Sequence, residues 1–143
     1  MIALGMCLLA HWLLARFVPW PWWVPNLTLA GLMLAIVKRP GQWLPLALVA
    51  GFFASLWTVR ASGGILVSYL AAGALMQAMA RRWDLEHGRV QWWLAGAGTF
   101  VFSLAVIWLE AIPVLPVLGL VIGHAAVTCA ALPLARRLAA VSS

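Results

Sequence analysis

Polar side chains inside apolar stretches of this sequence are the first candidates for a chemical function. His11 and His124 lie well inside such stretches, and Arg16 and Glu110 lie near the ends of two others. An ionisable group within a membrane span is costly, so each is by default a functional candidate. The alternative for each His is a neutral imidazole hydrogen-bonded to a neighbouring helix. Arg16 and Glu110 either pair with each other or extend separately to headgroups and water.

The residue sets that catalysis or metal binding requires do not occur. The three acidic residues are Asp84, Glu86 and Glu110, and the first two share one polar loop, so no carboxylate pair is expected inside an apolar segment. No phosphate-binding glycine loop or His-Glu-x-x-His motif is present. Cys129 follows His124 by five residues, which places the two on different helix faces. We therefore expect no enzyme, no catalytic residue, no metal site and no cofactor.

The composition predicts an integral membrane protein. Hydrophobic residues make up 66% of the 143 residues and charged residues 8%, whereas a soluble domain carries about 25% charged residues. The mean hydropathy is +1.04, which leaves too little polar surface for a fold that faces water. The basic residues come in pairs between apolar runs and form no stripe, which argues against nucleic acid as a partner and for membrane lipids.

Six apolar runs, separated by breaks at Pro, Gly, charged residues or Trp, predict six helices. They cover about 2–18, 25–37, 43–59, 62–80, 90–112 and 114–135. We predict a single transmembrane domain over 1–143, an all-α bundle of six transmembrane helices. The second run is short, because its residues rise only about 20 Å against a hydrocarbon core of about 30 Å. It therefore needs an extension, local thinning of the bilayer or longer neighbours that shield it.

The distribution of Lys and Arg predicts that both termini lie in the cytoplasm. With that orientation the inner connections and the C-terminal tail hold Lys38, Arg39, Arg81, Arg82, Arg89, Arg136 and Arg137, and the outer side holds Arg16 and Arg60. This is the bias that cytoplasmic loops show. Tryptophans, which favour both membrane interfaces, are predicted at the outer ends (Trp20, Trp22, Trp23, Trp57, Trp108) and the inner ends (Trp43, Trp83, Trp92, Trp93).

Small residues at helical spacing predict close helix packing. Ala47, Gly51 and Ser55 follow one another at i, i+4 in the third run, and Gly119 and Gly123 form a GxxxG pattern in the sixth. Gly63 stands near the start of the fourth run. Small side chains let helix backbones approach closely in lipid, either inside a bundle or against a partner protein. The sequence leaves both alternatives open.

The order of Pro and Gly residues between the second and fourth runs resembles the MreD family of bacterial rod-shape proteins. That family has Pro-Asp or Pro-Asn at the start of its second apolar segment, a Pro about fifteen residues later, and a third segment of the form G-x3-G-x3-D that ends near another Gly. The positions that match are Pro25, Asn26, Pro40, Gly51 and Gly63 or Gly64.

Two positions depart from the pattern. Ala47 replaces the first glycine and Ser55 replaces the Asp, which removes the carboxylate that the family carries there. The similarity extends in pattern over about residues 8–110. Its specific part is the segment from 25 to 64.

The resemblance implies a non-enzymatic, multi-pass scaffold in the bacterial cytoplasmic (inner) membrane. Proteins of the MreD family bind MreC, a single-span protein, and through it the MreB filament and the peptidoglycan synthases of cell elongation. The MreD fold is similar to that of the S-components of energy-coupling factor transporters. A small-molecule (vitamin) binding subunit of such a transporter is therefore the alternative.

Overall fold

The computed structural model describes residues 2–19, 23–56, 62–84 and 87–141, and this part of the chain is helical with no strand. Its helices are α1 (Ile2–Phe17), α2 (Leu27–Lys38), α3 (Trp43–Leu56), α4 (Ser62–Ala80), α5 (Gly88–Leu109) and α6 (Val114–Val141), with a 3-10 turn η2 (Pro40–Gln42) between α2 and α3. Each α-helix falls on one of the six predicted runs. The prediction of an all-helical chain with six helices is confirmed.

Three of the helices have the length and apolar composition to cross a membrane. They contain the segments Gly63–Ala80, Gly88–Leu109 and Val114–Ala140, of 18, 22 and 27 residues. About 20 helical residues are needed to cross the hydrocarbon core. The apolar helices α1, α2 and α3 are shorter. The long helices α4, α5 and α6 thus have the properties of membrane spans.

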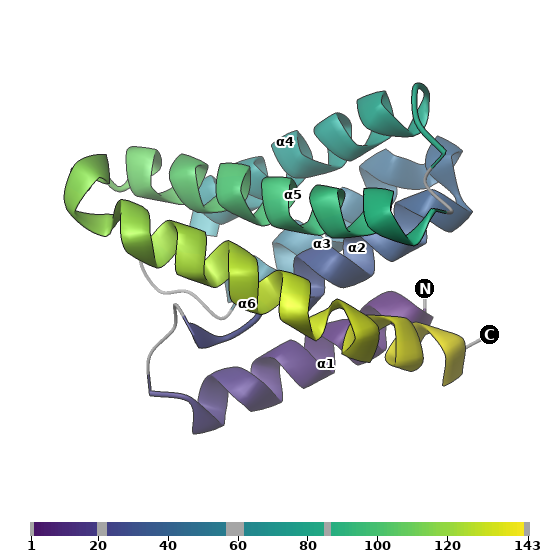
Figure 1. Cartoon of the computed structure of the whole chain (residues 1–143), viewed down its shortest axis with the longest axis horizontal. Coiled ribbons are helices and arrows are strands. Elements are labelled where there is room, and N and C mark those ends of the chain that lie inside the picture. Colours follow the sequence, from purple (N-terminus) through teal and green to yellow (C-terminus); the bar gives the residue numbers. More distant parts are fainter. Residues whose placement is uncertain (1, 20–22, 57–61, 85–86, 142–143) are drawn as a thin grey trace.

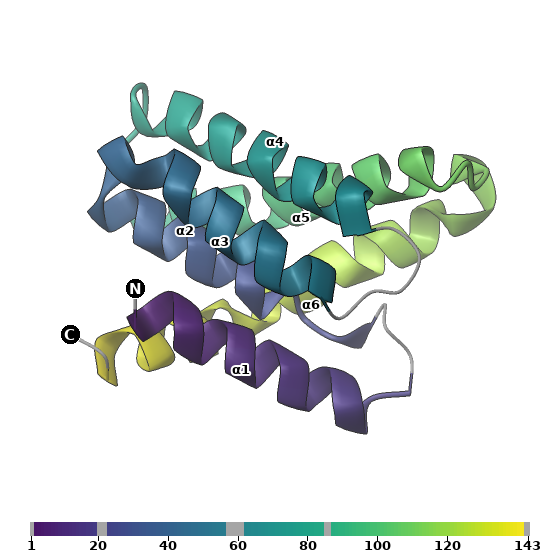
Figure 2. The same ribbon diagram turned by 180° about the vertical axis from the view of Figure 1, so that it is seen from behind.

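The helices lie side by side and alternate in direction, so that both chain termini lie at the same end of the bundle (Figures 1 and 2). The α2–α3 and α4–α5 connections lie at that end, and the α1–α2 and α5–α6 connections lie at the other. The elements at the first end carry Lys38, Arg39, Arg81, Arg82, Arg89, Arg136 and Arg137, whereas Arg16 belongs to the second. Arg60, Trp20, Trp22 and Trp57 lie outside the described residues.

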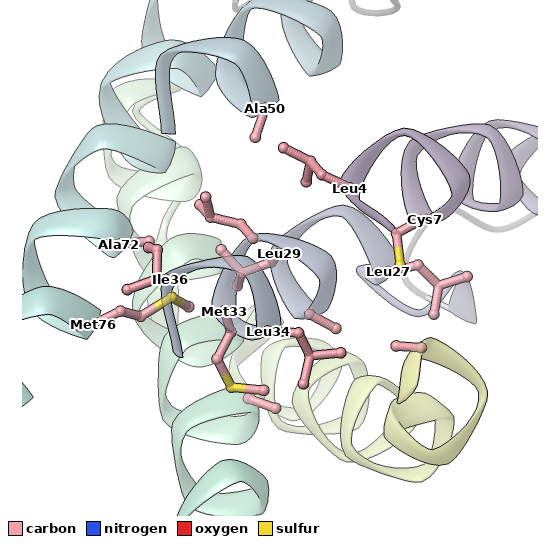
Figure 3. Packing of buried hydrophobic residues seen from close by; sticks show 14 of the residues in the cluster. Leu4, Cys7, Leu27, Leu29, Met33, Leu34, Ile36, Ala50, Ala72 and Met76 are labelled. Carbon is pink, nitrogen blue, oxygen red and sulfur yellow. The ribbon is translucent and has the colours of Figure 1, made fainter. Parts of the chain in front are cut away.

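The short helix α2 forms the centre of the bundle. Nine of its 12 residues are buried, as expected for a helix that is apolar on every face. It packs against α1, α3, α4, α5 and α6. Figure 3 shows Leu27 of α2 near Cys7 of α1, and Ile36 of α2 near Ala72 and Met76 of α4. The surrounding helices therefore shield this segment, which is too short to cross a bilayer by itself.

The last helix runs further than predicted. It was expected to end near residue 135, but α6 continues to Val141, because the Leu-, Ala- and Arg-rich segment after Pro133 consists of good helix formers. Arg136 consequently lies within the helix. Its side chain donates to Gln91 Oε1 (2.9 Å) and to the Gly88 carbonyl (3.3 Å), which ties the end of α6 to the start of α5.

Candidate functional site

The small residues of α3 pack against α4 inside the bundle. A Cβ added to Gly51 would lie 2.9 Å from Leu66 Cδ1 and 3.1 Å from Tyr69 Cβ. A Cβ added to Gly73 of α4 would lie 2.8 Å from the Ala47 side chain. The contact between α3 and α4 thus depends on glycine at both positions. Ala47 and Gly51 hold these two helices together and are not open to another protein.

Two further small residues of the predicted packing face lie elsewhere. Ser55 is half-buried, and its hydroxyl donates to the Phe52 carbonyl one turn earlier (2.7 Å). Gly63 is exposed at the start of α4, where an added Cβ would meet no described atom within 4 Å. Neither residue continues the close contact that Gly51 makes.

The small residues of α6 face outward. Gly119, Gly123, Ala126 and Ala130 are all exposed, and their spacing of four, three and four residues puts them on one side of the helix. We call these four residues the α6 stripe. A Cβ on either glycine would meet no described atom within 4 Å. The opposite side of α6 is the one buried in the bundle, through Val121, Thr128, Leu132 and Ala135.

An apolar groove of about 530 Å³ runs beside the α6 stripe, between α5 and α6. The residues that line it include the aromatic Trp92, Trp93 and Phe100 and the small Gly96 and Ala125. Trp93 is 75% exposed, so this part of the surface is both apolar and hollowed.

Asn26 connects three helices in the interior. Its Oδ1 accepts from the Leu29 N–H (3.0 Å), which caps α2, and from the Tyr69 hydroxyl of α4 (3.0 Å). Its backbone N–H donates to Thr128 Oγ1 of α6 (2.9 Å). Asn26 thus caps its own helix and bonds across to two others, and the residue is only 3% exposed.

His11 and His124, the histidines of the apolar helices α1 and α6, hydrogen-bond to neighbouring segments. His11 Nδ1 lies 2.9 Å from the Pro25 carbonyl. Because a carbonyl only accepts, Nδ1 carries the proton, and Nε2 of the neutral ring is an acceptor. His124 Nδ1 lies 3.1 Å from the hydroxyl of Ser103, which is buried on α5.

These polar residues line a pocket of about 440 Å³ to which every helix contributes. Its lining includes His11 (α1), Thr28 (α2), Ala54 (α3), Tyr69 (α4), Phe102 (α5) and His124 (α6), together with Asn26. The Tyr69 and Phe102 rings pack at 4.9 Å between centroids. The pocket uses the end of α1 and the start of α2, so it lies toward the end of the bundle away from the chain termini.

Arg16 and Glu110 do not pair. The Arg16 guanidinium lies 5.6 Å from the centroid of the Trp12 ring, and Glu110 follows α5 as an exposed cap residue. Within the described residues, the side chains of His87 and Asp84 do pair, with 3.2 Å between Nδ1 and Oδ2, in the α4–α5 connection. Of the two alternatives for Arg16 and Glu110, extension to the surroundings fits this geometry.

Pro40, the second proline of the Pro/Gly pattern, is the first residue of η2. The first residue of a helix needs no N–H for the helical hydrogen bonds, so proline fits there. Sequence reasoning missed Tyr69, Thr128 and Ser103. A signal for them was present, because Tyr69 is the only tyrosine and hydroxyl groups in apolar helices need hydrogen-bond partners.

The described residues hold no group of three His, Cys, Asp or Glu side chains placed to bind a metal ion.

The chain matches no protein-family model, and comparisons with curated proteins and with solved structures find no match. The α6 stripe and the pocket are the features of the structure from which a function can be inferred.

Proposed function

We propose that this protein is a non-enzymatic scaffold of the bacterial cell-elongation machinery that crosses the inner membrane six times and binds an MreC-like membrane protein. The observation that carries the proposal is the α6 stripe. It is an exposed surface of small residues on a helix long enough to span the bilayer.

The physical reason is that lipid tails are as apolar as the side chains of a membrane helix, so helices associate largely through close packing. The stripe lets a partner backbone approach α6 closely, since Gly119 and Gly123 have open space in front of them. Its spacing of four and three residues is that of the contact positions in a coiled coil. The groove beside it has room for larger side chains of the same partner helix.

The arrangement of charged and aromatic residues supports six spans with both termini in the cytoplasm. The end that holds the termini carries most of the described basic residues, as cytoplasmic ends of membrane proteins do. Exposed tryptophans occur at both ends of the bundle: Trp23 and Trp108 at one, Trp83 and Trp93 at the other. Tryptophan favours the two interfaces of a bilayer.

The Pro/Gly pattern supports the choice of partner. Pro25 and Asn26 directly precede α2, with Asn26 as its N-cap, and Pro40 opens the turn that leads to α3, in the order that resembles the MreD family. An MreC-like protein with one membrane span supplies a single helix, which is what the α6 stripe accommodates. Through that protein the scaffold would reach an MreB-like filament and the peptidoglycan synthases.

Co-purification of the tagged protein with a co-expressed MreC-like partner tests the proposal. Gly123→Leu, which fills the α6 stripe, is expected to reduce recovery of the partner by tenfold or more. Gly5→Leu is the matched control, because Gly5 is also exposed in a helix with no described atom within 4 Å of an added Cβ. Equal recovery with both variants would contradict the proposal. Recovery of an ATPase module in place of the MreC-like protein would favour the S-component alternative.

A further inference from the structure

The groove between α5 and α6, which lie next to each other in Figure 1, follows both helices along one side. The residues that α5 contributes include four spaced by three or four positions, which puts them on one helix face: Arg89, Trp93, Gly96 and Phe100. From the first to the last of these the helix rises about 16 Å. Half of a hydrocarbon core of about 30 Å is about 15 Å, so the groove has the length of one leaflet.

The groove opens to the outside of the bundle. Trp93 and Ile122, which line it from α5 and α6, are 75% and 55% exposed. Between the helices the lining residues are small, and a Cβ added to Gly96 would lie 2.9 Å from Cys129 Sγ. Both helices have the properties of membrane spans, so an opening on their outer side faces the acyl chains of lipids.

The groove carries positive charge at one end. Arg89 lines it from the first turn of α5 and is exposed. The Arg136 guanidinium, which donates to the Gly88 carbonyl, lies beside the same turn. No Asp or Glu of the described residues lines the groove, and Asp84 of the preceding connection is hydrogen-bonded to His87. The charge at this end is therefore complementary to an anionic headgroup.

We infer that the groove binds one anionic phospholipid from the leaflet on the side of the chain termini. One acyl chain lies along the apolar lining, and the phosphate accepts from the Arg89 guanidinium, a group suited to phosphate. Trp92 and Trp93 lie within about one turn of Arg89, at the level where tryptophan meets headgroups. Basic pockets between membrane helices are typical sites for anionic lipid headgroups.

The inference goes beyond the proposed scaffold role, because it requires α5 and α6 alone. The lipid occupies the groove in the protein without a partner, and larger side chains of a partner helix would displace its acyl chain. Lipid binding is therefore measured on the protein by itself. Loss of the MreC-like partner in the co-purification would leave the lipid result unchanged.

Native mass spectrometry of the full-length protein in a mild non-ionic detergent tests the inference. Phosphatidylglycerol and phosphatidylcholine with the same acyl chains are titrated separately. The first phosphatidylglycerol is expected to bind about fivefold or more tightly, because one Arg near a membrane surface favours an anionic lipid by about that factor. Equal affinity for the two lipids, or a dimer that carries no lipid, would overturn the inference.

Two variants separate the headgroup contact from the acyl-chain contact. Arg89→Gln is expected to reduce the preference for phosphatidylglycerol by about fivefold. Arg137→Gln removes an exposed charge at the same end of the bundle outside the groove and is expected to keep the preference. Equal preferences in these two variants would refute the headgroup contact.

Ala97→Phe fills the groove with a large side chain and is expected to weaken binding of both lipids. Ala71→Phe is the matched control, since Ala71 is exposed on α4 and does not line the groove. Equal lipid affinity in the two Phe variants would show that the acyl chain lies elsewhere and would overturn the inference.

Discussion

Replacing Gly51 with Ala tests whether the small residues of α3 serve internal packing. The added Cβ lies 2.9 Å from Leu66 Cδ1, 3.1 Å from Tyr69 Cβ and 3.2 Å from Leu66 Cα. The first atom ends a flexible side chain and can move. The other two are held by the backbone of α4, so α3 has to shift away from α4.

The matched control for this change is Gly123→Ala on the α6 stripe. Both substitutions add the same methyl group to a helix and share a gain in helix propensity of about 1 kcal/mol. At Gly123 the methyl group meets no described atom within 4 Å. The difference between the variants therefore isolates the steric overlap at Gly51, and overpacking of this kind costs about 1–3 kcal/mol. Gly51→Ala is expected to be less stable than Gly123→Ala by that amount.

The assay is equilibrium unfolding of the purified proteins in dodecyl maltoside micelles by titration with SDS, followed by circular dichroism. The free energies of unfolding of the two variants are compared with that of the unaltered protein. If Gly51→Ala is as stable as Gly123→Ala, α3 and α4 are not in close contact at Gly51. The assignment of the α3 residues to the interior and the α6 stripe to the surface would then be wrong.

Three further substitutions have expected effects in the same assay. Asn26→Ala removes a helix cap worth about 1 kcal/mol and leaves the Tyr69 hydroxyl without its acceptor, which costs about 1–3 kcal/mol. The free energy of unfolding is therefore expected to fall further than in Tyr69→Phe, which loses about 1 kcal/mol. The reverse order of the two variants would contradict the hydrogen bonds assigned to Asn26. Ala111→Gly is expected to stabilise by about 0.5–1 kcal/mol, because Ala111 has a left-handed φ of 54° that favours glycine; a loss of stability would refute this. Gln91→Leu removes the acceptor for Arg136 and is expected to lower the free energy of unfolding by about 1–3 kcal/mol. Gln91→Glu retains an acceptor oxygen and is expected to lose less. Equal losses of stability in the two variants would show that this hydrogen bond does not stabilise the protein.

The positions of the helices followed from the apolar runs, but the rotation of each helix about its axis did not. Ala47 and Gly51 share their spacing with Gly119 and Gly123, yet the first pair is buried and the second is exposed. These helices are apolar on every side, so no polar face indicates which side meets the core. The difference is set by neighbouring helices, such as Leu66 on α4, which sequence spacing does not reveal.

The polar interior could be predicted only in part. His11 and His124 stood out because polar side chains in apolar runs are rare, and Asn26 stood out as part of the Pro/Gly pattern. Their partners could not be identified, since Asn26 and Thr128 are 102 residues apart in the chain and Asn26 and Tyr69 are 43 apart. The pocket exists only where these distant positions meet, and no local pattern encodes that meeting.

The central claim is that the chain crosses the bilayer six times with both termini in the cytoplasm, and single-cysteine labelling tests it most directly. In a variant without Cys7 and Cys129, Asp84→Cys marks the α4–α5 connection and Ile112→Cys marks the α5–α6 connection. A membrane-impermeant maleimide added to intact spheroplasts is expected to label position 112 at once, and position 84 only after the membrane is opened. Labelling of position 84 in intact spheroplasts would contradict the orientation on which the proposed scaffold depends.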